Sequence, residues 1–78
     1  MKRVLVPLAE GFEEIEAVTI VDLLRRANVD VRTAALAGRR VTGSHGITLE
    51  ADLGLDGVRA ADYDMIVLPG GMPGADHL

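Results

Sequence analysis

The sequence of 78 residues contains no cysteine and no tryptophan, and it has only one tyrosine and one phenylalanine. Without a thiol, the chain forms no disulfide, supplies no thiolate to attack a carbonyl carbon, and contains no cysteine redox sensor. Aromatic residues make up 3% of the chain against 49% for hydrophobic residues as a whole. The core must therefore be aliphatic, which favours an α/β protein built on a parallel sheet.

Basic residues are also scarce, since eight lysines and arginines face twelve acidic residues and leave a net charge of −4. A general nucleic-acid binder needs a basic surface to neutralise phosphates, so this class is disfavoured. No apolar run approaches the length of a membrane span, and Met1-Lys2-Arg3 leads into a strand too short and too quickly acidic for a signal sequence. We expect a cytoplasmic protein with no nucleic-acid or membrane partner.

Hydrophobic patterning predicts three parallel strands, one long helix and a hairpin, all within a single domain over residues 1–78. A helix is expected from about Glu13 to Asn28, with Asn28 at its carboxyl-terminal cap. The turn residues Gly43-Ser44-His45-Gly46 predict a short hairpin. Pro7 is placed near the carboxyl end of the first strand, the end at which open α/β sheets bind ligands. The strands are expected at residues 4–8, 29–36 and 63–68, the hairpin arms at 41–42 and 47–51, and a short helix or turn at 55–61.

The expected helix carries more apolar residues than a helix covering one sheet requires. They spread around most of its circumference, so a second partner is expected on its outer side. The simplest partner is a copy of the chain across a twofold axis, which predicts a homodimer through this helix. The residues concerned are Ile15, Val18, Ile20, Val21, Leu23 and Leu24.

Three glutamates lie at the start of the helix, and Glu16 is the candidate for chemistry. Rooted among apolar neighbours, its carboxyl group is expected to be partly desolvated, to keep its proton near neutral pH and to donate a hydrogen bond. Glu13 and Glu14 have a simpler explanation, because acidic residues in a first turn complement the helix dipole. A metal site made from Glu10, Glu13, Glu14 and a histidine is conceivable, but nothing in the spacing requires it, and we expect neither a metal nor a cofactor.

The stretch Pro69-Gly70-Gly71 follows the last expected strand. Its backbone N–H groups could bind a phosphate or stabilise an oxyanion, and a plain turn is an equally open interpretation. The spacing fits neither the dinucleotide pattern nor the P-loop. His45 and His77 are expected to be incidental surface residues, and Ser44 lacks the strand-to-helix elbow that activates a serine nucleophile.

Three ordered blocks, together spanning the chain, closely resemble the ThiJ/PfpI superfamily, in particular the branch of bacterial YajL and the parkinsonism-associated deglycase. The resemblance implies a flavodoxin-like fold, with a parallel sheet sandwiched between helices, of which this chain supplies the amino-terminal half. It also implies dimers formed through the first helix. The blocks are residues 4–18, residues 22–27 and Tyr63-Asp64-Met65-Ile66-Val67-Leu68-Pro69-Gly70-Gly71.

By this resemblance, Glu16 matches the glutamate that hydrogen-bonds a reactive cysteine, and Gly71 matches the glycine whose N–H faces the active site. The implied activity is glyoxalase or deglycase chemistry on methylglyoxal and its adducts, with small carbonyl compounds or glycated proteins as substrates. Chaperone and oxidative-stress roles are implied as well. Relatives often carry a cysteine and an arginine in the loop occupied here by residues 43–46, so those side chains differ.

The cysteine of the family would follow some thirty residues beyond Leu78. We therefore expect this chain to be an amino-terminal part of a longer or split protein and to be inactive alone. Two other functions remain open: a noncatalytic dimerisation or chaperone-like module using the outer face of the first helix, and a small-anion or nucleotide site at Gly70-Gly71.

Overall fold

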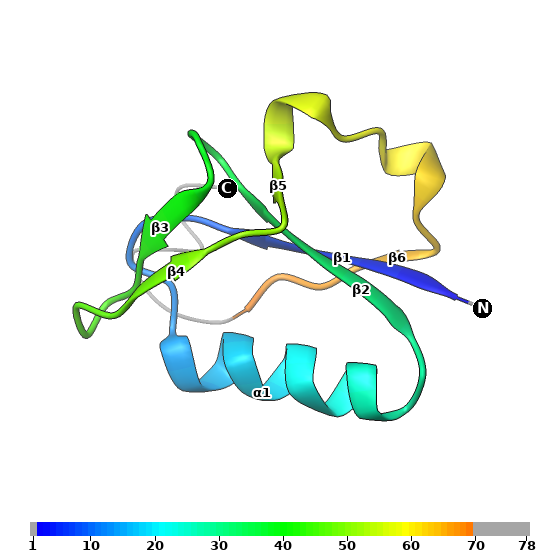
Figure 1. Cartoon of the computed structure of the whole chain (residues 1–78), viewed down its shortest axis with the longest axis horizontal. Helices are drawn as coiled ribbons and strands as arrows, with labels where there is room; N and C mark the ends of the chain where they lie inside the picture. The colour runs from blue at the N-terminus through cyan, green and yellow to red at the C-terminus, as the bar shows by residue number, and fades with distance from the viewer. Residues whose placement is uncertain (1, 70–78) are drawn as a thin grey trace.

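A four-stranded parallel sheet organises the computed structural model, which describes residues 2–69. Strand β1 (Arg3–Leu8) lies at its centre, because its aliphatic run is covered on both faces. The strand order is β5-β2-β1-β6, and β1 pairs with β2 in a register that runs from Arg3 opposite Asp30 to Leu8 opposite Ala35 (Figure 1). The other strands are β2 (Asp30–Ala35), β5 (Leu53–Gly54) and β6 (Met65–Ile66).

The expected strands are confirmed with one addition and one shortening. Pro7 lies in the second-last position of β1, opposite Ala34, as its lack of an N–H donor suggested. Strand β5 was not predicted, since two residues beside the outer edge of β2 are too short to leave a periodic signal. The third strand was expected at residues 63–68, but only Met65–Ile66 pair with β1. Among the described residues β6 is one edge of the sheet and β5 is the other, and Met65 in β6 is 58% exposed.

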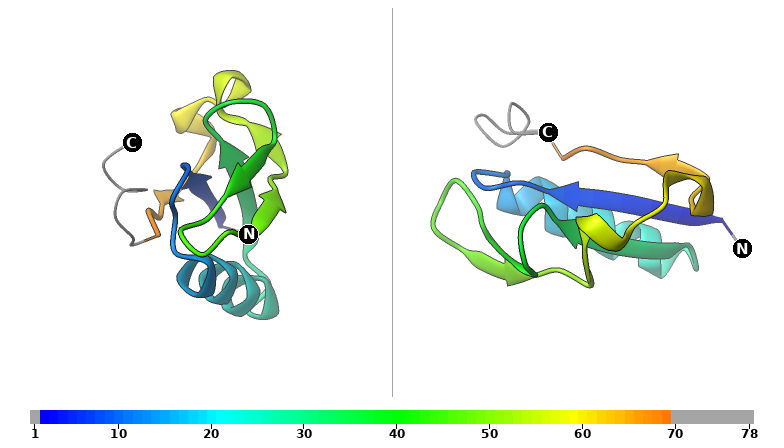
Figure 2. Two further views of the ribbon diagram at one scale, coloured as in Figure 1. Left: turned by 90° about the vertical axis from the view of Figure 1, so that its left-hand side faces the viewer. Right: turned by 90° about the horizontal axis from the view of Figure 1, so that it is seen from above.

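Helix α1 (Glu14–Arg26) runs along one face of the sheet, and the short 3₁₀ turns η1 (Leu55–Gly57) and η2 (Ala60–Asp62) lie on the opposite side (Figures 1 and 2). The helix is shorter than the range 13–28 predicted. Its termination is the expected one, because Asn28 adopts a left-handed conformation with φ 64° just after the last turn. Asn is one of the few side chains that tolerate this region.

The predicted hairpin is confirmed as an excursion from the main sheet. Strands β3 (Arg40–Thr42) and β4 (Thr48–Glu50) pair antiparallel, with Arg40 opposite Glu50 and Thr42 opposite Thr48. Residues 43–47, called the hairpin loop below, connect them. Figure 1 shows this hairpin beside the amino-terminal end of α1, so segments some thirty residues apart in sequence become neighbours.

The core lies between α1 and the sheet and consists of aliphatic side chains around a single phenylalanine, as the composition predicted. Phe12 is 2% exposed and sits at the turn between β1 and α1. The buried members of this cluster are Val4, Val6, Leu8, Phe12, Ala17, Val31, Ala35, Val41 and Ala51.

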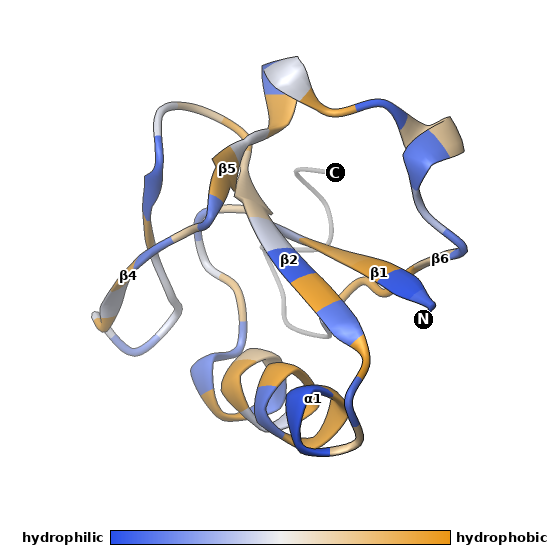
Figure 3. Cartoon of the chain, turned by 45° about the vertical axis from the view of Figure 1, so that its right-hand side comes forward, coloured by the Kyte–Doolittle hydropathy of each residue, from blue (hydrophilic) through white to orange (hydrophobic). Residues whose placement is uncertain are grey.

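The outer face of α1 carries exposed apolar side chains, as its two-sided pattern predicted, beside the Asp22–Arg26 ion pair. Ile15 is 81% exposed, Leu23 is 59% exposed and Val18 is 50% exposed. Figure 3 shows hydrophobic colour on several sides of this helix. Within residues 2–69, no helix combines the length and hydropathy needed to cross a bilayer.

Candidate functional site

The candidate site lies at the carboxyl end of β1, where the chain turns into α1. Glu16, the predicted catalytic carboxyl group, is the third residue of the helix and is exposed. The expectation that the described chain itself desolvates Glu16 is therefore wrong. Its apolar neighbours Ile15 and Val18 are exposed as well. Gly71, the second predicted site residue, and His77 lie outside the described residues.

The buried glutamate is Glu14, which the sequence explained only by the helix dipole. Its side chain is 6% exposed, and both carboxylate oxygens accept hydrogen bonds from the hairpin loop. One oxygen, Oε2, accepts the backbone N–H of His45 at 2.8 Å and of Ile47 at 3.2 Å. The other, Oε1, lies 3.1 Å from His45 Nδ1. A glutamate opening a helix and a glycine-containing turn were both visible in the sequence, but nothing in it linked them.

These contacts decide the charge of Glu14. Burial opposes ionisation and would by itself raise the pKa of the carboxyl group. Hydrogen bonds from its own backbone N–H, from His45 and from Ile47 outweigh burial and lower its pKa from 4.5 to about 2. Glu14 is therefore an ionised, hydrogen-bonded carboxylate at neutral pH, the reverse of the protonated carboxyl group predicted for Glu16.

The turn between β1 and α1 is joined to the hairpin by backbone bonds as well. Gly11 N–H donates to the carbonyl oxygen of Thr42 at 2.9 Å, and Ser44 N–H donates to that of Phe12 at 2.8 Å. The Glu10 carboxylate accepts the Thr42 N–H, with both oxygens at 3.3 Å. The segment leading into α1 is thus held along its length by the hairpin, and Glu14 is the buried end of that contact.

Gly43 makes room for the buried carboxylate. A Cβ atom at Gly43 would overlap Cγ, Cδ and Oε2 of the Glu14 side chain. An unrestrained glutamate could swing aside, but this one is fixed by its hydrogen bonds to His45 and Ile47. The glycine is therefore required by the close approach of a side chain.

The imidazole of His45 completes the cluster from the solvent side. Ser44 Oγ donates to Glu13 Oε1 at 2.9 Å and lies 3.0 Å from His45 Nδ1. A catalytic triad would place the serine and the acid on opposite ring nitrogens, whereas Ser44 and Glu14 share Nδ1. This arrangement does not activate Ser44, in agreement with the sequence. The hydrogen bond to Glu14, with the charges of Glu14 and Glu13, raises the pKa of His45.

The metal site weighed from the sequence has no geometric counterpart in the described part of the chain. Glu10, Glu13 and Glu14 each bind a different position of the hairpin, at Thr42, Ser44 and His45. Their carboxylates are occupied by N–H and O–H donors. Within residues 2–69, no three side chains of His, Asp or Glu converge in a way that could hold a metal ion.

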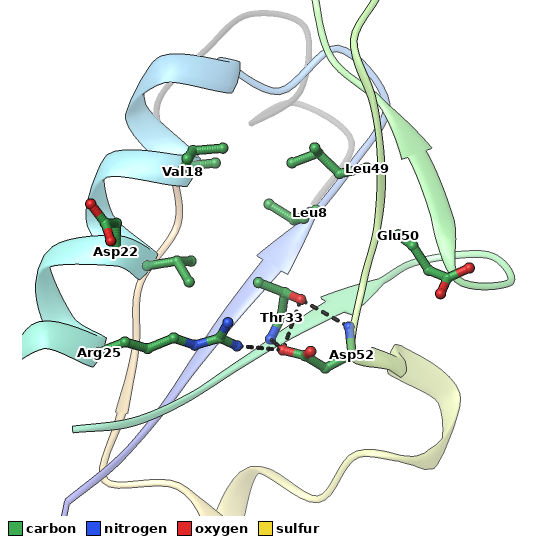
Figure 4. Close-up of a pocket in the computed structure, with 10 residues that line it drawn as sticks. Leu8, Val18, Asp22, Arg25, Thr33, Leu49, Glu50 and Asp52 are labelled. Atoms are coloured by element: carbon green, nitrogen blue, oxygen red, sulfur yellow. Dashed lines mark hydrogen bonds and ion pairs between the residues drawn. The ribbon is translucent and has the colours of Figure 1, made fainter. Parts of the chain in front are cut away.

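A separate cavity of about 360 Å³ lies between α1, β2, and β4 with the segment that follows it (Figure 4). Apolar side chains including Val18 and Leu49 line one part of it. At its polar end Asp52 accepts hydrogen bonds from Arg25 at 2.8 Å and from the Thr33 N–H at 2.9 Å. Burial would raise the pKa of Asp52, but the bonds from Thr33 and the Arg25 charge lower it below the ordinary value. The cavity is thus mainly apolar with one charged end, and it opens beside the exposed face of α1.

Replacing Gly43 by alanine tests the packing on Glu14. We expect Gly43→Ala to lower the free energy of unfolding by about 1–3 kcal/mol, the usual cost of overpacking a filled site. Gly57→Ala is the matched control, because nothing lies within 4 Å of a Cβ there. The loss should shrink when Gly43→Ala is combined with Glu14→Ala, as measured by urea unfolding of the single and double variants. Equal losses with and without Glu14 would contradict the packing argument.

Titration of His45 by NMR tests the carboxylate–imidazole contact. The His45 pKa should lie above its ordinary value of 6.5 and should fall in Glu14→Gln, because the neutral amide removes the charge that stabilises the imidazolium. A raised pKa means that this contact stabilises the fold below the ordinary pKa and that the contribution is lost as the pH rises through the raised value. Asp62→Asn, which removes a distant exposed carboxylate, should leave the titration unchanged; a similar effect from both variants would rule out a specific contact.

Comparison with known proteins tests the family resemblance that the sequence motifs indicated. The sequence pattern of the DJ-1/PfpI family matches residues 2–78. The chain is 48% identical over 75 residues to protein DJ-1 homolog B of Arabidopsis thaliana, covering 95% of this chain and 17% of that protein. It is 35% identical over 69 residues to a protein of Thermococcus kodakarensis named a deglycase, covering 88% of this chain and 42% of that protein.

Solved structures show the same relationship. The structure of oxidised DJ-1 from Toxoplasma gondii superposes with a TM-score of 0.92 at 45% identity, over 97% of this chain and 42% of that one. The chain thus spans less than half the length of these relatives. The likeness confirms the flavodoxin-like fold and the resemblance to the ThiJ/PfpI superfamily that the sequence motifs indicated. The chain belongs to the DJ-1/PfpI family.

Proposed function

We propose that the full-length protein carrying this chain is a cysteine-dependent glyoxalase or deglycase acting on methylglyoxal or its adducts, with a stress-protective role in the cytoplasm. What carries the proposal is membership of the DJ-1/PfpI family together with a relative named a deglycase. The substrates would be small carbonyl compounds or glycated proteins. Because this chain has no cysteine, the nucleophile must come from sequence beyond it.

In this proposal Glu16 acts on the thiol and Gly71 acts on the oxygen of the substrate. Glu16 is exposed in this chain, so the proposal requires sequence beyond the chain to cover it; a Glu16 kept protonated in that way would donate a hydrogen bond to the thiolate and so lower the thiol pKa. The N–H of Gly71 would help stabilise the developing oxyanion. The position of Glu16 supports its role, since it lies in the first turn of α1, directly after the carboxyl end of the central strand β1.

Glu16→Ala in the full-length protein is the direct test. We expect kcat/KM for methylglyoxal to fall by about 100-fold or more, the range of a lost proton-transfer or thiol-activating group, and the thiol pKa to rise. The measurements are lactate formation and the pH dependence of alkylation by iodoacetamide. Asp62→Ala, at an exposed position in η2, serves as the control. Unchanged turnover and an unchanged thiol pKa in Glu16→Ala would remove the role proposed for this residue.

A second candidate function is a noncatalytic dimerisation or chaperone-like module that uses the outer face of α1. The observation that favours it is the exposed apolar set of Ile15, Val18 and Leu23, next to the cavity of Figure 4. A homodimer through this helix is also compatible with the enzymatic proposal, so the two are separated by activity rather than by association. A third candidate, small-anion or nucleotide binding at Gly70-Gly71, rests on residues outside the described range.

A charge on the outer face of α1 tests the proposed homodimer. Val18→Asp should weaken association, because an ionised carboxylate would have to be buried without a partner in an apolar interface. Ala61→Asp in η2, on the opposite side of the sheet, should leave association unchanged. Analytical ultracentrifugation over a concentration series measures both variants, and an unaltered dimer in Val18→Asp would exclude this interface.

A further inference from the structure

We propose that Glu14 is a positioning residue that sets the first turn of α1, and with it Glu16, by fixing that turn to the hairpin loop. The inference rests on the role of Glu16 in the proposed function. It gives Glu14 and the hairpin loop a part in placing the Glu16 side chain.

The amino terminus of α1 lacks the usual means of fixing a helix start. Its N-cap is Glu13, whose side chain makes no capping hydrogen bond to the helix in the described structure. Ser, Thr, Asp and Asn are preferred at this position because their short side chains reach the N–H groups of the first turn. Glu13 instead accepts the hydroxyl of Ser44, so the helix start is tied to the hairpin loop rather than to itself.

Packing does little to hold the first turn. Ile15, the apolar side chain of that turn, is 81% exposed and therefore contributes little packing against the core. In the whole of α1 only Glu14 and Ala17 are buried. Ala17 fixes the second turn against the sheet, which leaves the Glu14 carboxylate as the buried contact of the first.

The hairpin loop is a firm partner for that carboxylate. It is closed internally, since Gly43 N–H donates to the carbonyl oxygen of Ile47 at 2.9 Å. At its base the hydroxyl oxygens of Thr42 and Thr48 lie 2.8 Å apart. The Ser44 N–H bond to Phe12 fixes the loop to the residue that precedes the N-cap. Glu14 therefore binds a loop that is closed on itself and bonded to the residue before the N-cap.

The contact between Glu14 and the hairpin loop controls the orientation of the Glu16 side chain. Glu16 lies two residues beyond Glu14 on the same rigid turn, so a rotation or fraying of the first turn moves both side chains together. Misplacement of a functional group by about 1 Å costs on the order of 100-fold in rate. Removal of the Glu14 carboxylate would thus change the thiol pKa by displacing Glu16, without any direct contact between Glu14 and the thiol.

Amide hydrogen exchange in the full-length protein tests the positioning itself, independently of any enzymatic activity. The first helical hydrogen bond runs from Ala17 N–H to the Glu13 carbonyl oxygen at 3.0 Å. In Glu14→Gln we expect exchange at Ala17, His45 and Ile47 to become about tenfold faster, while exchange in β1 and β2 stays unchanged. Asp62→Asn is the isosteric control. Unchanged exchange at those three amides, or equally faster exchange throughout the fold, would overturn the inference.

The thiol pKa of the full-length protein then tests the consequence for the site. Glu14→Gln should raise the pH midpoint of iodoacetamide alkylation in the same direction as Glu16→Ala, and adding it to Glu16→Ala should produce no further shift. A shift in Glu16→Ala but not in Glu14→Gln would overturn the inference and leave the proposed function standing. If Glu16→Ala produces no shift, the proposed role of Glu16 fails, and the exchange measurement alone decides whether Glu14 sets the helix start.

Discussion

The structure depends on one buried carboxylate that must stay charged. Glu14 is removed from solvent, yet its oxygens accept N–H bonds from two residues of the hairpin loop and lie beside an imidazole. A buried carboxylate is costly unless its hydrogen-bonding capacity is used, and here the hairpin loop uses it. Satisfying this group requires the glycine at residue 43, and together with the backbone bonds of Gly11 and Ser44 it joins the start of α1 to the hairpin.

Helix α1 carries apolar side chains on two sides, one facing the sheet and the other facing outward. Only Glu14 and Ala17 of α1 are buried, while several of its aliphatic side chains face outward beside a cavity that ends in the Arg25–Asp52 contact. Ile20, Val21 and Leu24 are partly buried and pack with Ala17 against the core, as the apolar stripe of a helix on a sheet does, so the outward residues are additional to that stripe. The outward residues are therefore a surface suited to a partner, and the hairpin contact at the amino terminus leaves that surface uncovered.

Much of the fold was predictable because its signals are local. The aliphatic run of β1, the left-handed Asn28 and the turn chemistry of residues 43–46 each specify their own structure, and each is confirmed. The site was only partly predictable. Sequence periodicity could not decide which glutamate is buried, because the partners of Glu14 lie more than thirty residues away. The periodicity predicted that Glu16 is desolvated, whereas contact with the hairpin loop, distant in sequence, buries Glu14.

The charge of Glu14 links this contact to pH. A pKa lowered from 4.5 to about 2 contributes stability above the ordinary value, and this contribution is lost as the pH falls toward the lowered one. The most direct measurement is a carbon-13 NMR titration of the Glu14 side-chain carboxyl group. A midpoint at about pH 2 is the result expected for a carboxylate held by the hairpin loop. A midpoint at the ordinary value of 4.5 would contradict the account, because the carboxyl group would then gain nothing from the loop.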